Sequence, residues 1–239
     1  MSVRFVDCRF GTGGAGGGYE GYLAAHLPGA AYADTERDLT GGEGGGRHPL
    51  PSAETFAAWA SAAGIGPGTL VVAYDEGTGW AARLWWLLRH FGHDACATIP
   101  FGAWRGPLAS GEERIEPGAF VCRARDDDTI SADEILSRLG DPRLVLYDAR
   151  SPERWRGEVE PLDPVAGRIP GSRNAFHVEP LPAAALAAEE LVFYCGSGVS
   201  ACPPLHAAVL AGRKDARLYP GSWSDWISRG FPVEKGKPE

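Results

Sequence analysis

The sequence predicts an α/β protein of two tandem domains, each a mainly parallel sheet flanked by helices. Three observations support this fold class. The chain of 239 residues repeats itself once, with a period long enough for a whole domain. Short, continuous apolar runs have the length of strands that are buried on both faces. Segments with helical start and stop signals lie between these runs, and such strand–helix alternation is typical of parallel sheets.

The internal repeat is the strongest of these observations. Four blocks of sequence recur in the same order in both halves. The matched pairs are VRFVDCR (3–9) with LVLYDAR (144–150), HLPGAAYAD (26–34) with RIPGSRNAF (168–176), TLVVAYDEGTGWAARL (69–84) with ELVFYCGSGVSACPPL (190–205), and PFGAW (100–104) with YPGSWSDW (219–226). A repeat of roughly 120–140 residues indicates two domains rather than a solenoid. We therefore expect domains at 1–110 and 128–239, joined by a polar linker at 111–127.

Helix signals mark both halves. In the first half, Ser52 stands before a helical pattern at 53–64 and is a suitable N-cap. In the second half, Ser131 and Glu134 form a capping-box pattern, and Gly140 supplies a stop signal. These segments are expected to pack on the sheets.

The amino-acid composition and net charge of the chain argue against several classes of function. Apolar residues make up 44% of the chain and charged residues 23%, which is ordinary for a globular protein. The net charge of −8 argues against nucleic acid as a partner, and no window is apolar enough to span a membrane. The first ten residues contain one arginine and no apolar h-region, so we expect no secretory signal, and the five cysteines are scattered without a CxxC pair. We expect a cytoplasmic protein without disulfides, metal or other cofactor.

One cysteine stands where a parallel sheet places its functional loops. The apolar run 191–194 predicts a buried strand, like that at 144–147, and Cys195 follows it directly. Loops at the carboxyl ends of parallel strands carry the ligand-binding groups. Gly196 and Gly198 allow the backbone to curl so that several N–H groups point at the sulfur, and the next helix adds its positive N-terminal end. The pattern predicts a stabilised thiolate and therefore a nucleophile.

The same loop resembles that of a known family. CGSGVS (195–200) is similar to the CGSGVT active-site loop of the tandem rhodanese-type sulfurtransferases, in its mercaptopyruvate-type variant. HLPGAAYAD, YDEGTGWAARLWW, DARSPERWRG and YPGSWSDW extend the resemblance over nearly the whole chain. It implies a sulfurtransferase in which Cys195 takes a sulfane sulfur from a donor as a persulfide and passes it to a thiophilic acceptor. The loop would comprise Gly196, Ser197, Gly198, Val199 and Ser200, with Ser200 in place of the threonine.

The repeat assigns different roles to the two halves. The residue that matches Cys195 in the first half is Asp75, and a carboxylate cannot carry sulfur in this way. We therefore expect the N-terminal domain to be catalytically inactive.

The donors of this family, thiosulfate and 3-mercaptopyruvate, are small anions, so the site requires arginines. By resemblance Arg154 is the first candidate, Arg156 the second, and Arg168 a third that could compensate for a missing arginine. Mercaptopyruvate-type members usually carry a further arginine nine residues after the first, and here that residue is Asp163. Arg150 is expected to pair with Asp148, because the same Asp-x-Arg pattern occurs in the first half.

Two prolines follow the loop. Pro203 and Pro204 are tolerated only in a first helical turn, so they are expected to move the start of the helix away from Cys195. Cys202 is either a resolving thiol for Cys195 or, more simply, a packing residue.

The sequence contains patterns of other functions as well. A GTGGAG segment at 11–16 matches a dinucleotide-binding pattern, but too short a helix fits before Pro28. A cysteine phosphatase would need an arginine where the chain has Ala201. A non-catalytic rhodanese-fold binding or regulatory module remains the alternative. The sequence leaves open which donor is preferred and whether the acceptor is a thiol, cyanide or a thioredoxin-like protein. The tandem design is expected to act as a monomer.

Overall fold

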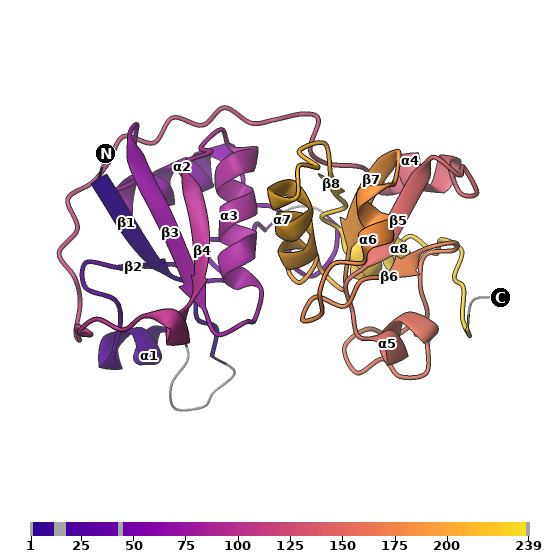
Figure 1. The fold of residues 1–239 in the computed structure, drawn as a ribbon, viewed down its shortest axis with the longest axis horizontal. Coiled ribbons are helices and arrows are strands. Elements are labelled where there is room, and N and C mark those ends of the chain that lie inside the picture. The colour runs from indigo at the N-terminus through magenta and orange to yellow at the C-terminus, as the bar shows by residue number, and fades with distance from the viewer. Residues whose placement is uncertain (1, 12–17, 43–44, 238–239) are drawn as a thin grey trace. The chain divides into compact units, whose positions relative to one another are not determined.

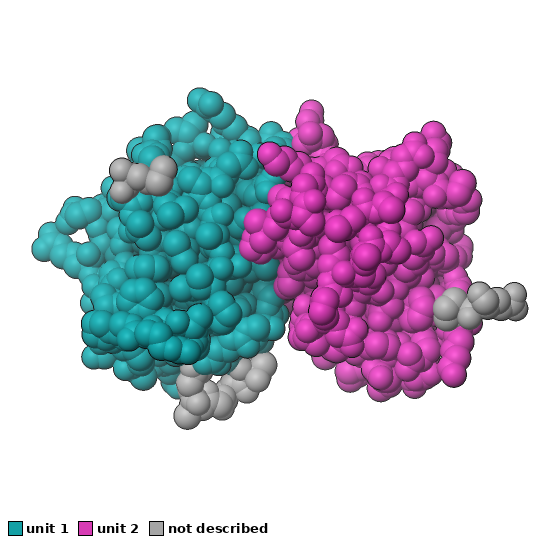
Figure 2. Space-filling view, viewed as in Figure 1, with its two compact units in different colours: residues 1–42, 50–125 teal, residues 43–49, 126–239 magenta. Residues whose placement is uncertain are grey.

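The computed structural model describes residues 2–11, 18–42 and 45–237, which form two compact units. Unit 1 holds the described residues of 1–42 and 50–125, and unit 2 those of 43–49 and 126–239 (Figure 2). Most of the 11–16 glycine segment lies outside the described residues. Each unit contains its own sheet (Figure 1).

Unit 1 is a four-stranded parallel sheet with helices against it. Its strands are β1 (Ser2–Asp7), β2 (Ala31–Tyr32), β3 (Thr69–Asp75) and β4 (Cys96–Pro100), in the order β2-β1-β3-β4. Its helices are α1 (Gly18–Ala24), α2 (Ala53–Ala62), α3 (Trp80–His90) and the 3₁₀ turn η1 (Phe101–Ala103). Helix α3 packs against β3 and β4, as Figure 1 shows.

Unit 2 repeats this plan. Its strands are β5 (Leu144–Asp148), β6 (Arg173–Asn174), β7 (Glu190–Tyr194) and β8 (Arg217–Leu218), in the order β6-β5-β7-β8. Its helices are α4 (Ala132–Ser137), α5 (Pro152–Arg156), α6 (Ala183–Leu186), α7 (Cys202–Leu210) and α8 (Ser222–Ser228). The ladder pairs between these strands are parallel in both units. The predicted fold class is confirmed.

The repeat is also visible in side-chain contacts. A buried tyrosine lies at or next to the end of a central strand in each unit, Tyr74 one residue before the end of β3 and Tyr194 at the end of β7. Each hydroxyl accepts the N–H of the residue before Pro-Gly, Leu27 in one unit and Ile169 in the other, at 3.2 Å. Burial raises the pKa of Tyr194 well above its ordinary value, so this hydroxyl stays neutral. The same tyrosine contact therefore fixes the Pro-Gly turn before the second strand of each unit.

The predicted helix starts are confirmed. Ser52 and Ser131 each accept the N–H of the residue three positions on, at 3.1 Å, and so cap α2 and α4. Helix α4 ends at Ser137, before the predicted stop signal. Gly140 lies in the following turn with φ +86°, which is a left-handed conformation that favours glycine.

The division into units differs from a simple cut of the sequence. The polar segment 111–125 forms no helix or strand and belongs to unit 1, where Gly118 and Arg123 donate backbone N–H groups to carbonyls of Ser61 and Phe91. Residues 45–49 belong to unit 2, although they lie in the first half of the chain. The sequence does not predict that this short segment belongs to unit 2, and its residues lie close to the loop after β7 described below.

Candidate active site

Cys195 lies at the carboxyl end of β7, where the loop to α7 begins. Its side chain is buried, and the backbone N–H of Gly198 points at its Sγ from 3.1 Å. Gly198 has φ +79°, and a Cβ there would collide with the carbonyl of Pro220. Glycine is therefore required for the curl that turns this N–H toward the sulfur.

The Gly-Ser-Trp segment 221–223 forms hydrogen bonds with the backbone of Cys195. Ser222 accepts the N–H of Cys195 at 3.1 Å and donates its hydroxyl to the carbonyl of Tyr219 at 2.9 Å. The backbone N–H of Trp223 donates to the carbonyl of Cys195 at 2.9 Å. Ser222 has φ +55°, and it is the one described non-glycine residue with a positive φ. This conformation is costly for a residue with a Cβ, which indicates that the hydroxyl and backbone contacts at this position hold it there.

The prolines after the loop lie in the first turn of α7, as expected. Helix α7 begins at Cys202, seven residues after Cys195, whereas α3 begins five residues after Asp75. Proline lacks the N–H that would continue helical bonding back into the loop, which accounts for the later start. Cys202 is buried, and its Sγ lies 3.4 Å from the carbonyl of Gly198. This contact fits a packing role for Cys202.

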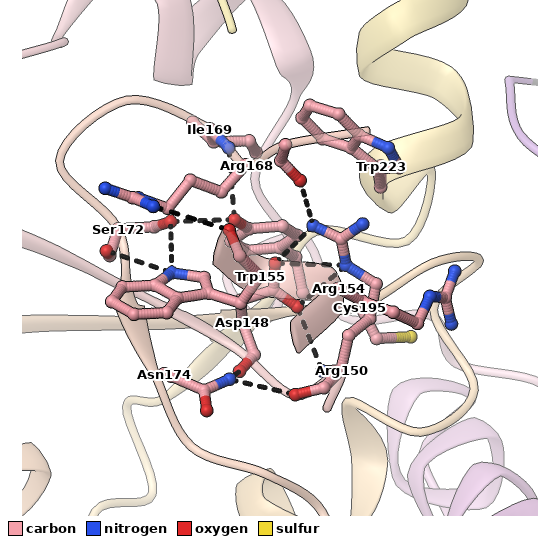
Figure 3. Close-up of polar contacts among 12 residues, drawn as sticks. Asp148, Arg150, Arg154, Trp155, Arg168, Ile169, Ser172, Asn174, Cys195 and Trp223 are labelled. Atoms are coloured by element: carbon pink, nitrogen blue, oxygen red, sulfur yellow. Dashed lines mark hydrogen bonds and ion pairs between the residues drawn. The ribbon is translucent and has the colours of Figure 1, made fainter. Parts of the chain in front are cut away.

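Arg154, on α5, lies beside the loop. Its Nε and Nη2 donate to the carboxylate of Glu160, the shortest contact being 2.6 Å. A Cβ at Gly196 would lie 3.4 Å from its Nη2, so the guanidinium borders the residue after Cys195. Figure 3 shows the side chains of Arg154 and Cys195 ending on the same side of the cluster. Burial opposes ionisation of Glu160, but the hydrogen bond and charge of Arg154 prevail and lower its pKa.

Arg150 has the structural role that the repeat predicts. It is fully buried, forms an ion pair with Asp148 at 2.6 Å and reaches Glu160 at 2.9 Å. Arg9 pairs with Asp7 in unit 1, also at 2.6 Å. Burial alone would lower the pKa of Arg150, but its carboxylate partners raise it above its ordinary value. Glu160 thereby links the buried Arg150 to Arg154.

The structure places the other two candidate arginines away from the loop. Arg156 pairs with Glu158 at 2.7 Å and with Glu153 of the same helix. Arg168 is buried, forms an ion pair with Glu234 and lies over the ring of Trp155 at 4.4 Å. In Figure 3 its guanidinium is on the opposite side of the cluster from the Cys195 sulfur. Its position corresponds to a histidine of the motif, but its length carries its charge toward the C-terminal segment.

Two residues that sequence reasoning missed lie at the loop. The segment 45–49 packs on unit 2, and the N–H of Arg47 donates to Ser224 Oγ at 3.1 Å. Nη2 of Arg47 would be 2.8 Å from a Cβ at Gly196. The neighbouring His48 has Nδ1 2.7 Å from Ser197 Oγ. The sequence offers one signal, a basic pair that closes a glycine-rich run (GGEGGGRHP), but nothing in it indicates which domain it joins.

Unit 1 has a different arrangement at the equivalent loop. Asp75 ends β3, and its carboxylate accepts the N–H groups of Gly77, Gly79 and Ala81 at 2.9–3.1 Å. The hydroxyl of Thr78 donates to the same carboxylate at 3.0 Å. The loop thus surrounds a built-in anion with donors.

The described residues offer neither a metal site nor a membrane segment. No group of three or more His, Cys, Asp or Glu side chains in this part of the chain could hold a metal ion. None of its helices is both long and apolar enough to cross a bilayer.

Comparison with known proteins shows which family the chain resembles. A family model described as "Rhodanese-like domain" matches residues 131–229. A probable 3-mercaptopyruvate sulfurtransferase of Pseudomonas aeruginosa is 41% identical, with 93% of this chain and 88% of the relative covered. A putative thiosulfate sulfurtransferase of Mycobacterium tuberculosis is 34% identical, with 92% and 86% covered. The crystal structure of SseA from Escherichia coli, titled as a 3-mercaptopyruvate sulfotransferase of the rhodanese fold, matches with a TM-score of 0.76, 26% identity and 93% of each chain covered.

Proposed function

Because this chain belongs to the tandem rhodanese family of sulfurtransferases and is itself a sulfurtransferase, we propose that Cys195 carries the transferred sulfur. The observation that supports this assignment most strongly is the N–H of Gly198 aimed at the Cys195 sulfur. A thiolate is the nucleophilic form of cysteine, and a fixed N–H dipole in a buried loop stabilises negative charge on it.

The proposed reaction has two sulfur-transfer steps. In the first, the Cys195 thiolate attacks the outer sulfur of the donor and forms a persulfide. With thiosulfate the sulfur–sulfur bond breaks, and sulfite leaves with the bonding electron pair. With 3-mercaptopyruvate the carbon–sulfur bond breaks, and the carbon takes a proton to give pyruvate. In the second step, an acceptor thiolate or cyanide takes the terminal sulfur and releases the Cys195 thiolate.

Arg154 is proposed to bind the anionic group of the donor. Its guanidinium borders Gly196 while Glu160 holds it through Nε and Nη2. Arginine binds carboxylates and sulfonates through paired N–H groups, so a fixed guanidinium would orient the donor as well as attract it. Arg156 and Arg168 have carboxylate partners elsewhere, so the geometry supports Arg154 over both.

The acceptor and the compartment are proposed on chemical grounds. A persulfide must discharge to a thiophilic group, and a small thiol or a thioredoxin-like protein suits a reducing cytoplasm. The five cysteines are all free thiols in the structure, which supports such a compartment.

Intact mass spectrometry of the reduced protein tests the assignment. The chain is incubated with thiosulfate or with 3-mercaptopyruvate, alongside Cys195→Ser and Cys202→Ser variants. We expect the wild type and Cys202→Ser to gain one sulfur atom and Cys195→Ser to gain none. The donor with the larger loading rate constant is the preferred one.

The Cys202→Ser variant is a matched control because both thiols are buried, Cys195 in the loop and Cys202 at the start of the helix that follows it. Loss of loading in Cys202→Ser with retention in Cys195→Ser would contradict the proposal. Absence of loading from both donors in the wild type would favour the non-catalytic binding module.

A further inference from the structure

Two guanidinium groups meet at Gly196, and only one of them comes from the segment after β5. A Cβ at Gly196 would be 2.8 Å from Nη2 of Arg47 and 3.4 Å from Nη2 of Arg154. Gly196 is the residue directly after Cys195, so both groups border the point at which a donor must present its sulfur. The absence of a side chain at this position leaves room for them.

Arg47 is held in place rather than left in solvent. Its Nη1 forms an ion pair with Asp163, whose side chain is only 3% exposed. Its backbone N–H is bound by Ser224, and Ser224 in turn donates its N–H to the carbonyl of Gly196. A flexible surface arginine would lose rotamer entropy on binding a ligand, whereas one already fixed through Nη1 loses less.

Asp163 connects the two arginines. One carboxylate oxygen is bound by Arg47, and the other lies 3.5 Å from Nη2 of Arg154. The buried carboxylate thus lies between two positive groups and offsets their mutual repulsion. The Arg47 side chain is one-third exposed (32%), so its guanidinium is accessible to a small molecule.

We propose that Arg47 is a second donor-binding residue, which together with Arg154 binds the anionic group of the sulfur donor, and that Asp163 positions both guanidiniums. This inference rests on the proposed function of Cys195. The ligand chemistry is a small anion with two or more terminal oxygens, which is common to a carboxylate and to the sulfonate end of thiosulfate. Paired charge-assisted hydrogen bonds suit either.

Binding is measured without sulfur transfer to keep the two proposals separable. Isothermal titration calorimetry of the Cys195→Ser protein uses two probes, thiosulfate and pyruvate, the latter as a carboxylate without sulfur. Adding Arg47→Ala is expected to raise the dissociation constant about 10- to 100-fold, the effect of losing charge-assisted hydrogen bonds. Arg47→Lys should give an intermediate loss, because lysine keeps the charge without the planar fork.

Arg143→Ala is the matched control. Arg143 is an exposed arginine of unit 2 paired with a nearby carboxylate, Asp141, so its removal changes the net charge equally without touching the loop. We expect less than a twofold change with either probe. In the active wild-type background, Arg47→Ala should slow donor loading and be partly rescued by added guanidinium ion, while discharge of a preformed persulfide is unchanged.

The outcomes separate the hypotheses. Equal dissociation constants with and without Arg47, or no binding of either anion, would overturn the role of Arg47. Loss of affinity for only one probe would support the role and identify the anionic group that is recognised. If anion binding to the Cys195→Ser protein depends on Arg47 but the wild-type protein never gains sulfur, the persulfide function alone would be rejected. Normal loading that is unaffected by Arg47→Ala would reject this inference alone.

Discussion

The loops after β3 and β7 occupy the same place in two copies of one fold, yet a different residue lies at the centre of each. In unit 1 the anion is part of the chain, since Asp75 accepts three backbone N–H groups and a hydroxyl. In unit 2 the equivalent residue is Cys195, toward which the N–H of Gly198 points. The comparison teaches that the same loop directs backbone N–H groups toward its central residue in both units, and that this residue is a carboxylate in unit 1 and a thiol in unit 2.

Two neighbouring differences accompany the change of central residue. The residue that supports Cys195 from the Gly-Ser-Trp segment is Ser222, and the matching residue of Gly-Ala-Trp in unit 1 is Ala103. The helix after the loop also starts two residues later in unit 2, where Pro203 and Pro204 lie in its first turn. Each difference can be reversed by substitution, which tests how much of the activity depends on it.

Replacing the central residue should have the largest effect. Cys195→Asp gives unit 2 the residue of unit 1, and we expect sulfur loading to fall to background because a carboxylate cannot form a persulfide. The fold should persist, since the loop can donate to a carboxylate as unit 1 does. Loading is followed by mass spectrometry and folding by thermal unfolding. Measurable loading of this variant would show that another thiol carries the sulfur.

Removing the support from Ser222 should have an intermediate effect. Ser222→Ala leaves the buried N–H of Cys195 without its acceptor, which costs about 1–3 kcal/mol of stability. We expect donor loading to slow by about tenfold, because a shift of the loop misaligns the sulfur. Stopped-flow loading and denaturant unfolding measure the two effects.

Ser222→Gly separates the hydroxyl from the backbone conformation. Glycine also lacks the hydroxyl but adopts φ +55° without the steric cost of a Cβ, so the Ser222→Gly protein should be more stable than Ser222→Ala by about 1–2 kcal/mol. Wild-type loading rates in both variants would contradict a role for the hydroxyl.

Restoring the earlier helix start should have the smallest effect. Pro203→Ala with Pro204→Ala returns two N–H groups to the first turn of α7, as in α3. The positive end of the helix would then lie closer to Cys195, and a helix terminus contributes about 0.3–1 kcal/mol to a nearby negative charge. We expect donor loading to accelerate about two- to fivefold. Unchanged or slower loading would show that the prolines do not limit the reactivity of the thiol.

The parts of the structure that were predictable depend on local sequence. The strands at 144–147 and 191–194, the N-caps Ser52 and Ser131, and the place of Cys195 follow from apolar runs, capping residues and glycines close together in the chain. The pairing of Arg150 with Asp148 was predictable because the repeat states it twice. The domain roles of Asp75 and Cys195 remain predictions.

The contribution of Arg47 was not predictable, because it depends on packing between distant segments. A side chain at Gly45 would collide with Asp225, and one at Gly46 would crowd the carbonyl of Gly221, so these glycines allow the segment to lie against the loop. No periodicity encodes that contact. Arg168 is the opposite case. Its place in the sequence motif predicted a position at the donor site, but its long side chain forms an ion pair with Glu234 instead.

Locating the transferred sulfur by peptide mass mapping tests the central claim most directly. The wild-type chain is loaded with donor, its thiols are blocked, and the cysteine-containing proteolytic peptides are fragmented in the mass spectrometer, which also separates Cys195 from Cys202 on the peptide that they share. We predict that the added sulfur is on Cys195 and on no other cysteine. Sulfur on Cys8, Cys96, Cys122 or Cys202, with none on Cys195, would contradict the assignment of the loop after β7 as the sulfur-carrying site.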